Sequence, residues 1–410
     1  MSDDDLGPLL ARVPEVLRGS SAYHVAQPPR VIAKLDANEL PVGFPPELRQ
    51  KLATALSEVA LERYPDPNAR RLRALLVERL DCEMGVDVTG EQLVFGNGSD
   101  ELISLLANAF PGPLLFPSPS FVYYKLAAIA RGLPSIEVPL TDRFELDEPA
   151  LIAAIESYRP SVVFLALPNN PTGTLWRPAI APELAARFRD TVIVSDEAYI
   201  AYAAVSNITA LKDHPNLVVM RTFSKIGLAG MRVGYTIQSK AIAHLLEKVR
   251  PPYNVSSLDQ RAAEFALEYA MDWCDAQAGH VVAERGRLAN ALAAKGLEVF
   301  PSAANLLLVR VPASYATASA SSASASSSSA SSSSASSSSA SSSSAPSSTS
   351  SASASSASAS PTGDAASALY AKLLAAGIVV RFFGAVGPLA GCLRITVGTP
   401  SENEALLSAL

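Results

Sequence analysis

Short apolar runs alternate with amphipathic stretches across the first two thirds of the chain. The amphipathic stretches, such as 99–110 and 148–159, repeat apolar residues at the helical period and predict helices. The apolar runs are rich in β-branched residues and predict strands that end at Gly96, Ser118, Leu167, Tyr199, Thr222 and Ile237. This alternation is typical of an α/β fold with a mostly parallel sheet between two layers of helices. Ligands of such sheets bind beyond the carboxyl ends of the strands, so the residues after each strand are the candidates for chemistry.

The last third of the chain has a different pattern. A long helical region is predicted over 257–295, and the pieces 296–311, 368–383 and 391–410 predict strand, helix, strand, strand and helix, a small α+β domain. A tract almost wholly of Ser and Ala interrupts this domain, and we predict a disordered insertion over 313–362 because it has too little apolar surface to offset the entropy of ordering. The small domain can tolerate the insertion, since loop closure costs only about 0.6 kcal/mol more per doubling of length.

Composition narrows the class of protein. The chain has 410 residues, 49% hydrophobic and 18% charged, with a net charge of −6. These values exclude a disordered or coiled-coil chain and argue against a nucleic-acid partner. No apolar window approaches the roughly 20 residues of a membrane span, and the acidic amino terminus lacks a signal-peptide pattern, so we expect a cytoplasmic protein. Three cysteines and four histidines are scattered along the chain, which predicts neither a disulfide framework nor a metal site.

Three predicted strand ends carry an amide, an acid and a base. Asn170 stands in PNNPTG, Asp196 follows an apolar run, and Lys225 follows the hydroxyls of Thr222 and Ser224. Each residue alone is ordinarily a solvated or ion-paired loop residue. Together they suit pyridoxal phosphate, which needs a lysine for a Schiff base, a carboxylate at the pyridine nitrogen and neutral donors at the ring oxygen.

The phosphate of such a cofactor needs backbone N–H groups at a helix start together with a guanidinium. The turn GNGSDEL provides Gly98 and Ser99 at a predicted helix start, and Arg232 follows the lysine. Asp100 and Glu101 stand in the same first turn, where a carboxylate near an anion is unfavourable. From the sequence, either they point away along the helix or they contact other groups.

Seven motifs carry a resemblance to a known family. The runs LDANELP, RYPDP, GNGSDEL, PNNPTG, SDEAYI, RTFSKIGLAGMRVGY and GCLRITVGTPSEN resemble the histidinol-phosphate aminotransferases, a branch of the fold-type I pyridoxal-phosphate aminotransferases. The resemblance extends from about Tyr23 to Leu410, apart from the Ser/Ala tract. It implies a large domain with a mostly parallel seven-stranded-type sheet between helices, and a smaller α+β domain. The implied division is an arm and small-domain segment at 1–45, a cofactor-binding domain at 46–275 and a small domain at 276–410.

The resemblance also implies a role for each matching residue. Lys225 is the expected catalytic residue, bonded to pyridoxal 5'-phosphate and transferring the proton. The other expected cofactor contacts are Asp196 at the pyridinium; Asn170 and Tyr199 at the ring oxygen; Phe121 over the ring; and Gly98, Ser99, Thr222 or Ser224, and Arg232 at the phosphate. Family enzymes are homodimers in which the RYP tyrosine, here Tyr64, reaches the partner's cofactor phosphate. The family often has an aromatic residue, Tyr or Phe, over the cofactor ring at this turn. Here it is Phe121, which has no hydroxyl, and Tyr123 or Tyr124 could substitute only if the turn is shifted.

The implied substrates are L-histidinol phosphate and 2-oxoglutarate, in histidine biosynthesis. Arginine pairs with both phosphate and carboxylate, and the expected substrate contacts are Arg381, Arg394, Tyr23, Asn38, Tyr253 and Asn305. Three alternatives stay open: an aminotransferase for aromatic amino acids or another phosphorylated amine, a pyridoxal-phosphate decarboxylase or lyase, and a non-catalytic scaffold tethered by the Ser/Ala tract.

Overall fold

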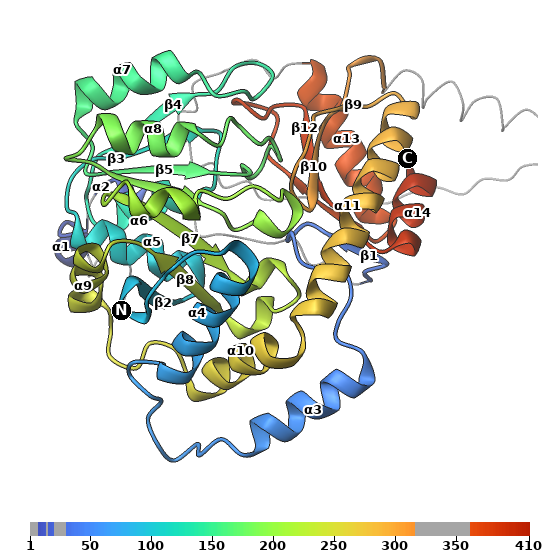
Figure 1. Cartoon of the computed structure of the whole chain (residues 1–410). Helices are drawn as coiled ribbons and strands as arrows, with labels where there is room; N and C mark the ends of the chain where they lie inside the picture. The colour runs from blue at the N-terminus through green and yellow to red at the C-terminus, as the bar shows by residue number, and fades with distance from the viewer. Residues whose placement is uncertain (1–6, 14, 20–29, 316–360) are drawn as a thin grey trace, which may run out of the picture.

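The computed structural model describes residues 7–13, 15–19, 30–315 and 361–410 (Figure 1). Within them a seven-stranded sheet has the order β2-β8-β7-β6-β5-β3-β4, and only β8 runs antiparallel to its neighbours. The strands are β2 (Leu93–Asn97), β3 (Leu114–Ser118), β4 (Ser135–Pro139), β5 (Val162–Ala166), β6 (Val192–Asp196), β7 (Leu217–Thr222) and β8 (Val233–Ile237). The predicted α/β fold with a mostly parallel sheet is confirmed.

Helices cover both faces of this sheet. On one face lie α5 (Gly98–Ala109), α6 (Tyr123–Ala130) and α9 (Lys240–Val249); on the other lie α4 (Arg70–Met84), α7 (Glu148–Tyr158), α8 (Ile180–Arg187) and α10 (Ser257–Tyr269). Alternate residues of one strand enter opposite cores: Val163 and Leu165 pack on the second face, and Val162 and Phe164 on the first. Burial on both faces explains why the strands are continuous apolar runs.

The structure differs from the sequence expectations at three of these elements. The edge strand β4 was not predicted. It is half-buried and has Glu137 in its middle, so it gives only a weak apolar signal. The strand predicted to end at Tyr199 ends at Asp196, where the chain turns away from the sheet. The helical region 257–295 is two helices, α10 and α11 (Met271–Ala294), which meet at Ala270.

Local capping fixes several helix starts. The side chain of Asp147 accepts a hydrogen bond from the Ala150 N–H at the start of α7, and Ser239 and Ser256 cap α9 and α10 in the same way. At the start of α14 (Pro400–Ala409), Thr399 and Glu402 form a reciprocal capping box.

A second sheet has the order β1-β11-β12-β10-β9 and lies beside the first, at the right of Figure 1. Its strands are β1 (Ala33–Leu35), β9 (Glu298–Val299), β10 (Leu306–Arg310), β11 (Ile378–Phe382) and β12 (Cys392–Thr396), and α11, α13 (Pro361–Ala375) and α14 pack against it. The strand from the N-terminal segment, β1, pairs in parallel with β11. The remaining helices are α1 (Gly7–Leu10), α2 (Glu15–Arg18) and α3 (Pro46–Ser57).

The predicted division at 1–45, 46–275 and 276–410 stays a prediction, and α11 runs through its second boundary. Most of the predicted disordered insertion over 313–362 lies outside the described residues, namely 316–360, whereas 361 and 362 belong to α13 and are helical. No helix among the described residues is both long and apolar enough to cross a membrane. The described part of the chain also brings no three His, Cys, Asp or Glu side chains together as metal ligands would require.

Candidate active site

The predicted amide, acid and base meet at the carboxyl edge of the large sheet. Asn170 follows β5, Asp196 ends β6, and Lys225 closes the short 3-10 turn Phe223–Lys225 after β7. Because β5, β6 and β7 are parallel neighbours, their ends lie side by side. A cavity of about 200 Å³ opens there, and its lining includes Asn38, Ser99, Phe121, Tyr124, Asn170, Asp196, Tyr199, Thr222, Ser224, Lys225, Arg232 and Arg394.

Asp196 is held from below by two donors. The Tyr124 hydroxyl donates to its Oδ2 at 2.5 Å, and the Ala198 N–H donates to its Oδ1 at 3.1 Å. Burial raises the pKa of Asp196 to about 6, although both hydrogen bonds favour the charged form. Tyr124 is itself fully buried against Phe164, with ring centroids 4.7 Å apart. Burial and the nearby carboxylate raise the pKa of Tyr124 well above its usual value, so this hydroxyl stays a donor.

Lys225 lies in surroundings that favour a neutral amine. Burial, and then the positive charge of Arg394, lower the pKa of Lys225 to about 8. Its Nζ lies 5.7 Å from the centroid of the Tyr199 ring. The Tyr202 hydroxyl donates to the Lys225 carbonyl oxygen and fixes the backbone of the turn. A lysine of this kind is a nucleophile near neutral pH.

The start of α5 and Arg232 form an anion cradle. Gly98 has φ +77°, a conformation that favours glycine, and a Cβ built on it would lie 2.6 Å from Nη2 of Arg232 and displace that guanidinium. The Arg232 Nη1 donates to Ser224 Oγ at 3.4 Å. The Thr222 hydroxyl accepts a hydrogen bond from the Ser224 N–H at 3.1 Å and donates to the Val233 carbonyl oxygen at 3.2 Å. Of the two candidate hydroxyls, Thr222 therefore stabilises the turn and Ser224 contacts the guanidinium.

The two carboxylates in the first turn of α5 contact other groups. Asp100 forms an ion pair with Arg232 at 3.1 Å. Glu101 turns back and accepts from the Asn97 N–H at 2.6 Å and from Asn254 Nδ2 at 2.7 Å. Only Asp100 therefore competes with an incoming anion for the guanidinium, and the rest of the helix start keeps its positive character.

A chain of hydrogen bonds connects the two sheets across the cavity. Arg394, on β12, donates from Nη1 to Asn170 Oδ1 at 2.7 Å and from Nη2 to the carbonyl oxygen of Asp36. Asn38 Nδ2 lies 2.9 Å from the Tyr199 hydroxyl, which it meets as a donor. Asn305 was expected at the substrate side, but it lies fully buried in the layer behind Asn38 and donates to its carbonyl at 3.0 Å.

A second cavity of about 640 Å³ adjoins the first and shares Asp100, Phe121, Asn170 and Arg394 with it. Arg381 lines this larger cavity and is the cross-strand partner of Arg394, so two guanidinium-bearing residues face one space. Of the three aromatic candidates, Phe121 borders both cavities.

The two neighbouring tyrosines each line one cavity, Tyr124 the smaller and Tyr123 the larger, and their hydroxyls are hydrogen-bonded. The Tyr123 hydroxyl lies 3.1 Å from Ser104 Oγ, and Tyr124 meets Phe121 edge-on at 5.7 Å beneath the cavity. Among Phe121, Tyr123 and Tyr124, Phe121 is the side chain that lines both cavities.

Two of the expected tyrosines line neither cavity. Tyr64 and Tyr253 stack on each other with ring centroids 4.6 Å apart, and they are 80% and 42% exposed. Tyr23 lies outside the described residues.

The residues around the smaller cavity fit pyridoxal phosphate. The donor set combines a buried amine, a buried carboxylate, an amide and phenol pair, and a helix start whose glycine leaves space beside a guanidinium. Each group suits one part of the cofactor: the amine suits the aldehyde, the carboxylate the ring nitrogen, the amide and phenol the ring oxygen, and the helix start with its guanidinium the phosphate.

Comparison with known proteins agrees with this geometry. The family model described as aminotransferase class I and II matches residues 30–410. The chain belongs to this family. Among curated aminotransferases, histidinol-phosphate aminotransferase 2 of Cupriavidus pinatubonensis is 39% identical over 96% of this chain and 94% of its own length. Histidinol-phosphate aminotransferase of Methylibium petroleiphilum is 38% identical over 99% and 95%.

Solved aminotransferases share the fold. Histidinol-phosphate aminotransferase from Sinorhizobium meliloti, in complex with pyridoxal-5'-phosphate, has a TM-score of 0.74 and 25% identity, covering 98% of this chain and 96% of that one. A tetra mutant of Thermus thermophilus aspartate aminotransferase has a TM-score of 0.69 at 20% identity, covering 97% and 99%. The expectation of the fold-type I aminotransferase architecture is confirmed.

Sequence reasoning about this aminotransferase missed the role of Tyr124. It considered the residue only as a substitute for Phe121, whereas the structure places it under Asp196, 72 positions away. A weak signal was present, because a tyrosine two helical residues into α6 points into the sheet when α6 packs on β3. The hydrogen bond between Arg394 and Asn170 was also missed, because the two residues are 224 positions apart in the sequence and no local pattern connects them.

Proposed function

We propose that this protein is a histidinol-phosphate aminotransferase that depends on pyridoxal 5'-phosphate. It transfers the amino group of L-histidinol phosphate to 2-oxoglutarate, giving imidazole-acetol phosphate and L-glutamate, a reaction of histidine biosynthesis. The observation that carries the proposal is the meeting of Lys225, Asp196, Asn170 and Tyr199 around one cavity beside the anion cradle of α5. A binding scaffold has no need of this combination.

When bound, the cofactor supplies an aldehyde that joins amines and a ring that accepts electrons from the reacting carbon. Asp196 would hold its ring nitrogen, Asn170 and Tyr199 its ring oxygen, and Phe121 its face. Its phosphate would be held by Gly98, Ser99, Ser224 and Arg232, with Thr222 bracing the turn.

Lys225 is the proposed nucleophile and proton carrier. Because its pKa is about 8, a large share of the Nζ groups is neutral near pH 8 and able to form a bond to a carbonyl carbon. The same Nζ, once free, can accept a proton from the substrate and deliver it again. Its fixed backbone, held by Tyr202, keeps the amine in the cavity during both transfers.

Arg381 and Arg394 are the proposed anion contacts of the substrates. A phosphate in one half-reaction and carboxylates in the other can each pair with the planar guanidinium fork. Arg394 is already held by Asn170 and Asp36, so its orientation is fixed before a substrate arrives. Asn38 is proposed to contact the substrate from the N-terminal segment, and Tyr23 and Tyr253 to contribute to the imidazole side.

We also propose a homodimer. Tyr64 and Tyr253 form an exposed aromatic stack away from the cavity of their own chain, and a second copy would cover it. In this arrangement Tyr64 would meet the cofactor phosphate of the partner. All three cysteines are unpaired, which suits the reducing cytoplasm where we place the enzyme.

The test is a turnover assay of purified protein loaded with cofactor. We expect glutamate to form from L-histidinol phosphate and 2-oxoglutarate, with a much lower kcat/KM for unphosphorylated histidinol and for phenylalanine. Release of carbon dioxide, or a preference for phenylalanine, would replace this function by a decarboxylase or an aromatic aminotransferase. Arg381→Gln should raise KM for histidinol phosphate and leave KM for histidinol unchanged.

A further inference from the structure

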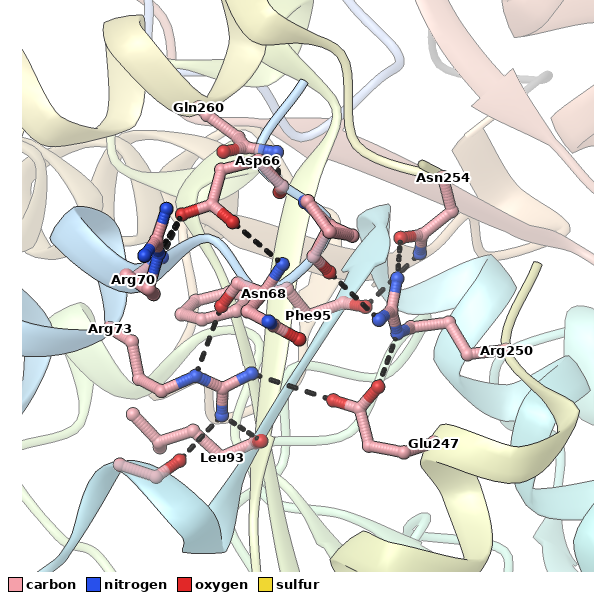
Figure 2. Close-up of polar contacts among 12 residues, drawn as sticks. Asp66, Asn68, Arg70, Arg73, Leu93, Phe95, Glu247, Arg250, Asn254 and Gln260 are labelled. Atoms are coloured by element: carbon pink, nitrogen blue, oxygen red, sulfur yellow. Dashed lines mark hydrogen bonds and ion pairs between the residues drawn. The ribbon is translucent and has the colours of Figure 1, made fainter. Parts of the chain in front are cut away.

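A polar network joins the turn that carries Tyr64 to the loop that carries Tyr253. Figure 2 shows Arg250 at the right, between Asn254 and Glu247, and all three of its guanidinium nitrogens form hydrogen bonds. Its Nη2 donates to the carbonyl oxygen of Pro67 at 2.9 Å, and its Nη1 donates to Asn254 Oδ1 at 2.7 Å. Its Nε donates to Glu247 at 2.7 Å, and only 12% of its side chain is exposed.

Each end of this network leads to a residue of the aromatic stack. Pro67 stands three positions after Tyr64, and Asn254 directly follows Tyr253, whose φ of +58° is a left-handed conformation that the loop must hold. One guanidinium thus bonds the backbone of the turn after Tyr64 and the side chain of the residue that follows Tyr253. Planar, bidentate geometry suits arginine for this task better than lysine.

Contacts around Arg250 keep the two segments in place independently of a partner. Gln260 Nε2 donates to the carbonyl oxygens of Asp66 and Val255, both at 3.0 Å, and so makes a second tie between the segments. Glu247 also meets Arg73 Nη2 at 3.4 Å. The network is therefore assembled within one chain.

The start of α5 has supports besides Arg250. Asn254 Nδ2 donates to the Phe95 carbonyl at 3.1 Å, and Glu101 accepts from the Asn97 N–H. The carbonyl oxygen of Pro67, by contrast, accepts its hydrogen bond from Arg250. Gln260 still holds the Asp66 carbonyl when the guanidinium is removed, but the Pro67 carbonyl loses its donor, so the turn after Tyr64 should loosen more than the anion cradle of its own chain.

We propose that Arg250 is a positioning residue that acts in trans: it sets the turn of Tyr64 so that the phenol reaches the cofactor phosphate of the partner subunit. This proposal rests on the proposed homodimer. It predicts that loss of Arg250 weakens cofactor binding at the site of the neighbouring chain and spares the site of its own chain.

Two hybrid dimers separate these effects, with cofactor dissociation constants measured by equilibrium titration of the lysine-dependent absorbance. In the first, an Arg250→Ala chain is paired with a Lys225→Ala chain, so the one lysine-bearing site receives Tyr64 from the chain with an intact Arg250. In the second, a wild-type chain is paired with a chain carrying both changes, so the lysine-bearing site receives Tyr64 from the altered chain. We expect wild-type affinity in the first hybrid and about tenfold weaker affinity in the second, the size of one lost hydrogen bond to a charged group.

Equal affinities in the two hybrids, or weak binding in the first alone, would overturn the proposal. If Arg250→Ala does not fold, Arg250→Lys replaces it in both hybrids, since one ammonium cannot bond Pro67, Asn254 and Glu247 as the fork does, and the same order of affinities is expected. Arg159→Ala, which removes an exposed ion pair with Asp190, is the control and should leave both hybrids unchanged.

Binding of the cofactor needs no substrate, so this experiment stays informative if the protein fails to turn over histidinol phosphate. In that case the proposed substrate is wrong and the role of Arg250 is still decided. A chain that is monomeric at micromolar concentration would refute the homodimer and the role of Arg250 together.

Discussion

Tyr124→Phe isolates the bond that keeps Asp196 charged. The change removes one hydroxyl and leaves the ring that stacks on Phe164 in place. A hydrogen bond to a charged group contributes about 1.5–3 kcal/mol, and 1.36 kcal/mol corresponds to one pKa unit. The variant should therefore raise the pKa of Asp196 from about 6 to roughly 7–8 in the cofactor-free protein.

The sign of the effect on stability follows from the raised pKa. A carboxyl whose folded pKa exceeds its unfolded pKa binds more protons in the folded state between those two values, so the free energy of unfolding falls as pH rises through that window. In the wild type this contribution should be lost between about pH 4 and pH 6. In Tyr124→Phe the loss should continue to about pH 7–8.

Urea unfolding of the cofactor-free protein at a series of pH values measures this window. At pH 7 the variant should also bind the cofactor about two- to tenfold more weakly, because part of the carboxyl must first lose its proton. Tyr123→Phe is the matched control, since its hydroxyl meets Ser104 and not the carboxylate. An unchanged pH window in Tyr124→Phe, or an equal change in Tyr123→Phe, would refute the reasoning.

Three further predictions concern the amine, the cradle and the core. Lys225→Ala should abolish transamination and the absorbance of the lysine-bound cofactor, and retention of either would refute its role. Gly98→Ala should weaken binding of pyridoxal phosphate at least about tenfold but of pyridoxal little, because its Cβ meets a guanidinium at 2.6 Å; Gly132→Ala, at φ +64° with nothing within 4 Å, controls for backbone strain alone. Arg221→Met breaks a buried ion pair and should lower the free energy of unfolding by about 3–5 kcal/mol, against at most about 1 kcal/mol for the exposed Arg159→Met, as chemical denaturation would show.

Much of the lining of the smaller cavity was predictable, because the signals of its residues are local in sequence. Asn170, Asp196 and Lys225 each follow an apolar strand, and parallel strands of one sheet bring such ends to one edge whatever their distance in sequence. Gly98 could be placed for a similar reason, because a glycine between a strand and a helix indicates a tight turn. The same local pattern, a polar residue or glycine directly after an apolar strand, was enough to predict each of these positions.

Other features depend on contacts that no local pattern records. The edge strand around Glu137 gave no clear signal because one side of it is solvated, and the break at Ala270 lies inside a continuous helical period. Neither the residue beneath Asp196 nor the partner of Arg394 could be inferred, since each bond joins segments that only packing brings together.

The sequence by itself determined which chemical groups stand at the strand ends, because strand periodicity and turn residues act over a few positions. Tertiary structure alone decided how those groups are charged and held: burial lowers the pKa of Lys225 and raises that of Asp196, and both effects require the surrounding protein to exclude water. Tertiary structure also decided that Arg250 connects the turn at Pro67 with the loop at Asn254, because the hydrogen bonds of a guanidinium depend on which acceptors lie near it in space.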